Sequence, residues 1–275
     1  MIPISIPWLK QPQQPVSFKL AAKNQGLRHL IYGGEFAIGD NSWQGSSTPE
    51  RITFSQGVAR RFVKASSQAL VSPSAIATTD LTLFIVARLS PDGLGANRAL
   101  ISAGNSIAFP TRYMLYYGGT NLIAAFQAGS TGSGQAYLGT PITNTTDFYV
   151  YIARFSGTSY RDLWLNGSLV ATDTTPGVFA APTTVAVGGY WLEGSLSSGY
   201  YFSGDVACAG FFNRAISDAE ARSLSKTALS YTALLDRRSF YLPTPISSTL
   251  PTLSAARAKA GSITSTGWIS QITAS

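Results

Sequence analysis

The segment LWLNGSLVATD, residues 163–173, contains an Asn-Gly pair between two apolar runs. Both residues of a two-residue hairpin turn must accept a positive φ angle, and Asn166 and Gly167 are of the types that do so most readily. The segment therefore predicts a tight β-hairpin. Such a turn sets the register of the two strands that it joins, and we find no catalytic group in it.

Strand-like segments continue on both sides of this hairpin, from about residue 50 to residue 215. They are short and alternate with clusters of Gly, Asn, Asp, Ser and Pro, a pattern typical of an all-β sandwich or barrel. Residues 80–90, DLTLFIVARLS, are apolar at so many consecutive positions that we expect this strand to be buried on both faces. Since no long helical segment separates the strands, a parallel α/β sheet is not expected.

One helix is predicted after these strands, over about residues 217–230. Ser217 followed by Glu220 is a capping box, in which each side chain satisfies a backbone N–H group at the start of the helix. The leucines downstream can then turn toward the sheet.

The two ends of the chain differ in character from the middle. Residues 1–15 are interrupted by prolines, and residues 241–275 are rich in Pro, Ser and Thr. The predicted organisation is an N-terminal arm over 1–15, a sandwich over 16–240 and a C-terminal tail over 241–275. Whether residues 16–50 lie inside the sandwich is left open.

The residue types that most catalytic and metal sites need are scarce in this chain. Cys208 is its one cysteine and His29 its one histidine, which excludes an intrachain disulfide and a Cys/His zinc site and gives no support to a Ser-His-Asp triad. Cys208 is expected to be a small buried core residue. No run reaches the roughly 18 apolar residues of a membrane-spanning helix, and the prolines at the start do not fit a signal peptide.

The net charge of +7 is carried by the two ends of the chain. Residues 1–34 and residues 237–275 each contain four basic residues and no acidic one, whereas residues 35–236 contain 12 basic and 13 acidic residues. Charges spaced this widely favour docking on an acidic protein surface over binding to nucleic acid, which uses denser Lys/Arg clusters. The remaining alternative is that the basic residues serve only to keep the protein soluble. The expected partner anchors at the two ends are Trp8, Arg237, Arg238 and Trp268.

The order of these segments resembles the laminin-G-like, concanavalin A-like lectin/glucanase superfamily. The resemblance covers roughly residues 50–227 and rests on GVARRFVKASSQALV, DLTLFIVARL, FYVYIARFSGTSYRDLWLNGSLVATD, VAVGGY and YFSGDVACAGFFNRAISDAEARSL. It implies an antiparallel jelly-roll β-sandwich with one short C-terminal helix and extended terminal arms. It is more specific for the fold than for an activity.

A narrower resemblance lies just beyond the helix. LLDRRSFYLP followed by PTLSAAR is similar to a group of laminin-G-like proteins of tailed bacteriophages and prophages, although Asp236 stands where that group has proline. The resemblance implies a virion protein, made in the host cytoplasm. It does not indicate which part of the virion holds it.

Members of this superfamily have two kinds of sugar site, catalytic and binding. Retaining glucanases of this superfamily carry Glu-x-Asp-x-Glu on one strand, and the chain has no such run, so we expect no enzyme activity. Lectins use aromatic platforms beside polar groups, which Tyr190, Trp191, Tyr200 and Tyr201 could supply. Packing of these aromatics in the core or under loops is the alternative, but the glycines around Trp191 suggest an exposed loop.

We expect no cofactor. Laminin-G-like domains can nevertheless hold calcium at a loop rim. The candidate ligands fall in turn-like contexts without a ligand spacing; they are Asp40, Asp92, Asp173 and Asp205.

The leading interpretation is a non-enzymatic bacteriophage structural protein, a capsid decoration or cement protein attached through its terminal arms. Its partners would be other virion proteins, first of all the major capsid protein, with further copies of itself in the assembled particle, and neither nucleic acid nor membrane. The alternative is a carbohydrate-binding module of a tail or head fibre that contacts a host glycan.

Overall fold

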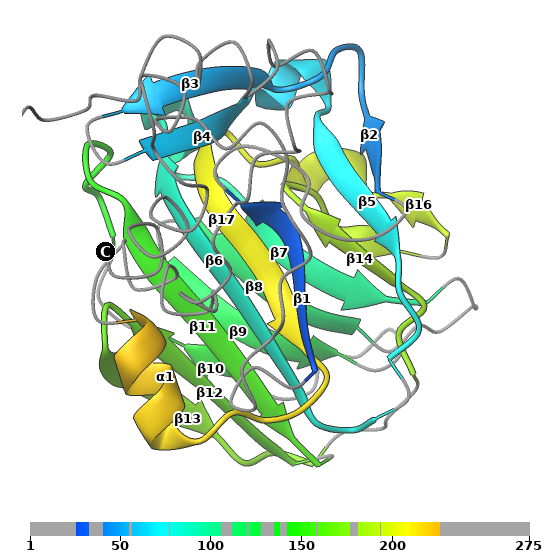
Figure 1. The fold of residues 1–275 in the computed structure, drawn as a ribbon, viewed down its shortest axis with the longest axis vertical. Helices are drawn as coiled ribbons and strands as arrows, with labels where there is room; N and C mark the ends of the chain where they lie inside the picture. The colour runs from blue at the N-terminus through cyan, green and yellow to red at the C-terminus, as the bar shows by residue number, and fades with distance from the viewer. Residues whose placement is uncertain are drawn as a thin grey trace, which may run out of the picture. The chain divides into compact units, whose positions relative to one another are not determined.

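Two antiparallel β-sheets packed face to face make up the described part of the chain (Figure 1), which confirms the predicted all-β sandwich. None of the described helices is long and apolar enough to cross a membrane. The predicted N-terminal arm (1–15) and C-terminal tail (241–275) lie outside the described residues, as do the four expected anchor residues and residues 226–230 of the predicted helix. The computed structural model describes residues 26–32, 41–54, 57–76, 78–105, 112–119, 121–127, 135–137, 142–157, 159–176, 181–192 and 194–225.

The first sheet has eight strands. Its strand β17 pairs with three others, β6, β4 and β1. Its order is β13 (Ser168–Asp173), β12 (Tyr160–Leu165), β11 (Tyr149–Ser156), β6 (Leu81–Leu89), β17 (Gly204–Phe212), β4 (Gly57–Phe62) and β3 (Glu50–Phe54), with β1 (Leu27–Tyr32) off this path.

The second sheet has seven strands, and a separate two-stranded hairpin consists of β15 (Trp191–Leu192) and β16 (Ser195–Leu196). Because β1 and β2 pair within the two sheets, part of the 16–50 segment belongs to the sandwich. The order of the second sheet is β10 (Gln135–Tyr137), β9 (Asn121–Gln127), β8 (Arg112–Gly118), β7 (Arg98–Gly104), β14 (Thr184–Val187), β5 (Ala69–Pro73) and β2 (Ser42–Gln44).

Strand β6 is buried on both faces, as its sequence predicts. Leu83 and Ile85 point into the core between the sheets, whereas Phe84 and Val86 belong to a second apolar layer on the outer face of the first sheet. Successive side chains of a strand point to opposite faces, so a continuous apolar run fits only a strand that is covered twice. Cys208 of β17 is fully buried in the outer layer, and this burial raises the pKa of its thiol.

The predicted Asn-Gly hairpin joins β12 to β13. Asn166 has φ of 46° and Gly167 has φ of 87°, the left-handed values that this turn requires. The Asn166 Oδ1 atom accepts a hydrogen bond of 2.8 Å from the Val150 N–H group, and the Gly167 N–H group donates to Ser225 Oγ at 2.9 Å. The turn is therefore tied to β11 and to the end of the helix.

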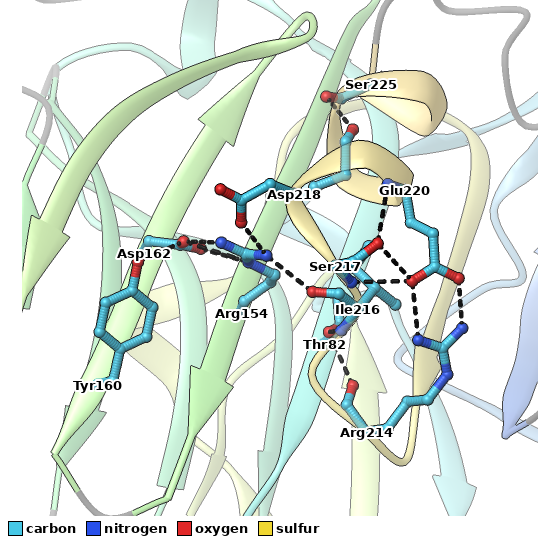
Figure 2. Close-up of polar contacts among 11 residues, drawn as sticks. Thr82, Arg154, Tyr160, Asp162, Arg214, Ile216, Ser217, Asp218, Glu220 and Ser225 are labelled. Carbon is cyan, nitrogen blue, oxygen red and sulfur yellow. Dashed lines mark hydrogen bonds and ion pairs between the residues drawn. The ribbon is translucent and has the colours of Figure 1, made fainter.

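Helix α1 (Asp218–Ser225) begins with the predicted capping box, shown in Figure 2. The Ser217 N–H group donates to Glu220 Oε2 at 2.8 Å, and the Glu220 N–H group donates to Ser217 Oγ at 3.3 Å. Arg214 adds a bidentate contact to the same carboxylate, at 2.7 and 2.9 Å. The cap therefore joins the helix start to the turn that follows β17.

This cap predicts a pH-dependent contribution to stability. Hydrogen bonds from Arg214 lower the pKa of Glu220 from 4.5 to about 2, helped by those from Ser217 and opposed by burial. Since the folded-state pKa lies below the unfolded value, the stabilisation is complete above pH 4.5 and is lost as the pH falls toward 2. We expect the difference in unfolding free energy between wild type and Glu220→Gln to shrink over this range in urea titrations. A difference that does not change with pH would contradict this assignment.

Candidate functional site

Three charged residues lie in a row across the first sheet, at one end of its central strands. Asp205 of β17 pairs in register with Arg61 of β4 on one side and with Arg88 of β6 on the other. The neighbours Phe62 and Leu89 point into the core. Because side chains alternate between the faces of a strand, the charged row lies on the outer face of the sheet.

The Asp205 carboxylate holds both guanidinium groups. Arg61 donates from Nε to Oδ1 at 2.9 Å and from Nη2 to Oδ2 at 3.3 Å, and Arg88 donates from Nε to Oδ2 at 2.7 Å. The hydrogen bonds to Asp205 also raise the pKa of Arg61. The Asp205 side chain is only 6% exposed, against 47% for Arg61 and 26% for Arg88. The arginines therefore cover the carboxylate and face solvent themselves.

A second polar cluster surrounds Asp92 in the short helix η4 (Pro91–Gly93), which follows β6. Ser203 Oγ lies 2.9 Å from both Asp92 carboxylate oxygens, and Ser90 Oγ also donates to Asp92. Burial alone would raise the pKa of Asp92, but these hydrogen bonds and the nearby charge of Lys64 lower it. Asp92 is thus kept as a carboxylate that accepts hydrogen bonds.

Both clusters line one cavity of about 530 Å³ at this end of the sandwich, referred to below as the rim pocket. Its volume lies within the range of about 300–1,000 Å³ that is usual for small-molecule sites. Phe62, Val63, Leu89 and Pro91 supply its apolar lining. The polar lining includes the residues of these two clusters, namely Arg61, Arg88, Ser90, Asp92, Ser203 and Asp205.

A family model for the concanavalin A-like lectin/glucanases superfamily matches residues 64–222, more than half of the chain. The chain belongs to this superfamily. The match runs from just after β4 into α1, so it includes most of both sheets. A search of the curated proteins found no match.

Solved structures with the same fold have low sequence identity to this superfamily member. A mutant of HCR/D is 10% identical with a TM-score of 0.56, over 75% of this chain and 52% of that one. Trypanosoma rangeli sialidase in complex with sialic acid is 16% identical with a TM-score of 0.53, over 76% of this chain and 33% of that one. Domain 4 of the Geobacillus stearothermophilus arabinanase AbnA, in complex with arabinotriose, is 13% identical with a TM-score of 0.49, over 68% and 88%. This chain thus spans about half of the first protein and a third of the second, and the likeness shows the fold alone.

Of the four aromatic residues singled out in the sequence, Tyr190 and Tyr200 pack in one small cluster with residues of the second sheet. Tyr190 is 4% exposed and packs in a small cluster with Met114. Its ring centroid lies 4.9 Å from that of Tyr200, which is half-buried, as is Tyr201. The structure therefore brings Tyr190 and Tyr200 together as packed side chains, and a sugar-binding role for the group stays a prediction.

Trp191 lies in a strand and not in the exposed loop that its flanking glycines suggested. It is the first residue of β15, and its backbone N–H group donates to Ser102 Oγ at 3.1 Å, which fixes the hairpin to β7. Its indole Nε1 is enclosed and has no hydrogen-bond partner among the described residues. Gly188 and Gly189 are needed for close packing, because an added Cβ would meet Phe62 or Leu196 within 3 Å. Glycine at these two positions therefore indicates close packing and not an exposed loop.

Of the aspartates considered for calcium, Asp92 and Asp205 both line the rim pocket, and Asp173 does not. Asp205 lies in strand β17 and not in a turn, and Asp173 at the end of β13 pairs with Arg161 at 3.1 Å, while Asp40 lies outside the described residues. Within the described ranges, no group of three or more His, Cys, Asp or Glu residues is placed to hold a metal ion. The sequence analysis missed the charged row. Its signal was Arg88 and Asp205, each the one charge in a long apolar strand, whereas Arg61 stands beside Arg60 in β4.

Proposed function

We propose that this chain is a non-enzymatic carbohydrate-binding protein that uses the rim pocket, as a module of a bacteriophage tail or head fibre. The observation that carries the proposal is the convergence of guanidinium, carboxylate and hydroxyl groups in one cavity of about 530 Å³. Membership of a superfamily of lectins and glucanases supports a sugar ligand. The resemblance of LLDRRSFYLP to phage proteins supports the virion context.

The chemistry of the pocket suits a saccharide. Sugar hydroxyl groups can donate to the Asp92 carboxylate and accept from the arginine N–H groups. Val63 and Pro91, which are both exposed, offer apolar surface to the C–H faces of a sugar ring. A site with both donors and acceptors can orient a ligand that carries many hydroxyl groups.

The carboxylates of the pocket support binding without hydrolysis. A glycosidase needs one carboxylic acid with a raised pKa as proton donor. The pKa of Asp92 is lowered, and both oxygens of Asp205 accept hydrogen bonds from arginines. Asp92 is therefore suited to accepting hydrogen bonds from a ligand, whereas Asp205 is covered by the two arginines that it holds.

The test is a glycan array with a variant that fills the pocket. Val63 lines the pocket and is 40% exposed, so Val63→Trp adds bulk without removing a hydrogen bond. We expect it to weaken glycan binding about tenfold or more, whereas Leu169→Trp, at a 47% exposed position outside the pocket, leaves binding unchanged. Loss of binding in Trp191→Ala but not in Val63→Trp would move the site to the aromatic cluster. An array with no bound glycan would overturn the proposal.

Capsid decoration is the second candidate function. It is favoured by the charge distribution, with four basic and no acidic residues in each of the segments 1–34 and 237–275. Complementary charge on an acidic shell would guide such ends to their partners, which would include the major capsid protein. The same array separates the two functions, because a decoration protein needs no glycan.

A further inference from the structure

We infer that the ligand of the rim pocket is an acidic saccharide whose carboxylate binds Arg61 and Arg88. This inference rests on the proposed function and names its substrate class. It follows from how the two guanidinium groups are held and from which of their N–H groups remain available.

Strand pairing places the two arginines together. Arg61 and Arg88 stand on strands that flank β17, so their backbones are separated by two strand spacings, about 10 Å. Both side chains nevertheless reach the same Asp205 oxygen, Oδ2, at 3.3 and 2.7 Å. Asp205 is therefore a positioning residue that draws two cationic groups to one point in the pocket wall.

Each guanidinium keeps a free edge. Arg61 uses Nε and Nη2 on Asp205, while Arg88 uses Nε on Asp205 and Nη1 on the Thr146 carbonyl at 3.3 Å. Neither Arg61 Nη1 nor Arg88 Nη2 has a hydrogen-bond partner among the described residues. An arginine has five N–H donors, so both can still donate to a ligand.

The charge of the row favours an anion. Two guanidinium groups and one carboxylate leave a formal charge of +1, and Asp205 is almost completely covered. The Arg88 guanidinium also lies over the Phe148 ring, 5.0 Å from its centroid, which limits its movement. Planar arginine forks match a carboxylate better than other cationic side chains do.

The opposite polarity of Asp92 sets the orientation of the ligand. Its carboxylate repels anionic groups and accepts from hydroxyl groups, and its own contacts to Ser90 and Ser203 hold it in place. A sugar acid satisfies both ends, with its carboxylate at the arginines and its hydroxyl groups at Asp92. A ligand with anionic groups all round would meet repulsion at Asp92.

The experiment uses isothermal titration calorimetry to measure the binding of two matched pairs of ligands to the full-length protein. Trigalacturonate is compared with its fully methyl-esterified form, and sialyllactose is compared with lactose. We expect at least one acid to bind about tenfold or more tightly than its neutral counterpart, because hydrogen bonds to charged groups are the stronger kind. Arg61→Gln and Arg88→Gln should each remove this preference.

Controls separate the role of the fork from stability and from net charge. Arg222→Gln removes an exposed arginine of α1 and should keep the preference. Arg61→Lys keeps the charge but not the planar fork, and it should lose part of the preference at an unchanged unfolding midpoint. Equal binding of acid and neutral partners, blocked by Val63→Trp, would overturn the acidic ligand and leave the proposed function standing. If neither ligand pair binds and the glycan array shows no bound glycan, the acidic ligand and the proposed function are both overturned.

Discussion

Replacement of Asp162 by alanine is expected to lower the free energy of unfolding by about 3–5 kcal/mol, the usual loss when one partner of a buried ion pair is removed. Asp162 of β12 is completely buried, and Arg154 of β11, its cross-strand partner, is 8% exposed. Arg154 Nε lies 3.0 and 3.1 Å from the two carboxylate oxygens, and Tyr160 Oη donates to the same group at 3.0 Å (Figure 2). Without Asp162, the buried guanidinium loses its main counter-charge.

The matched control is the second carboxylate on the same guanidinium. Asp218 of α1 lies 2.7 Å from Arg154 Nη1, but its side chain is 70% exposed. Because solvent screens exposed ion pairs, Asp218→Ala should cost no more than about 1 kcal/mol. Urea denaturation followed by circular dichroism measures both losses. Equal losses would show that burial does not decide the strength of these contacts.

A second control removes both buried charges. Arg154→Met combined with Asp162→Leu leaves no unpaired charge and should recover most of the stability that Asp162→Ala loses. The Arg154 Nη1 group also donates to the Ile216 carbonyl at 2.7 Å, so the double variant tests whether that contact alone holds the turn before α1. If the double variant were as unstable as Asp162→Ala, we would attribute the loss of stability to this turn.

The parts of the fold that could be predicted from the sequence are those set by neighbouring residues. The Asn166-Gly167 turn and the Ser217–Glu220 cap each depend on side chains within four positions of one another, so the short-range pattern is sufficient. The continuous apolar run of β6 likewise predicts burial on both faces. These three features were confirmed because no distant contact was needed to define them.

The charged row could not be predicted, because strand order brings it together. Arg61, Arg88 and Asp205 are adjacent only because β17 inserts between β4 and β6, which precede it by more than a hundred residues. Alternation along a strand indicates which face a side chain takes, but not which strands are neighbours. The Arg154–Asp162 pair was closer to prediction, since Arg154 is the one charge in β11 and Asp162 lies in the next strand along the chain, beside Arg161.

Replacement of Gly188 by alanine has the second large expected effect, a loss of about 2–5 kcal/mol in the free energy of unfolding. Gly188 has φ of 77°, a left-handed value that costs other residues about 1–2 kcal/mol. An added Cβ would also lie 2.6 Å from two carbons of the Phe62 ring. That ring packs edge-on against Trp43 and Phe202, with centroids 5.9 and 6.2 Å away, so it cannot move aside without disturbing the core.

Two comparisons separate the backbone cost from the steric cost. Gly95 has φ of 74° and nothing within 4 Å of an added Cβ, so Gly95→Ala should show the backbone cost of about 1–2 kcal/mol alone. In a Phe62→Leu background the clash at Gly188 is relieved, and Gly188→Ala should then cost about as much as Gly95→Ala. A double-mutant cycle from thermal and urea unfolding measures this coupling. Additive losses at Phe62 and Gly188 would mean that the ring does not require glycine at this position, and the glycines before Trp191 would then have to be explained by the turn alone.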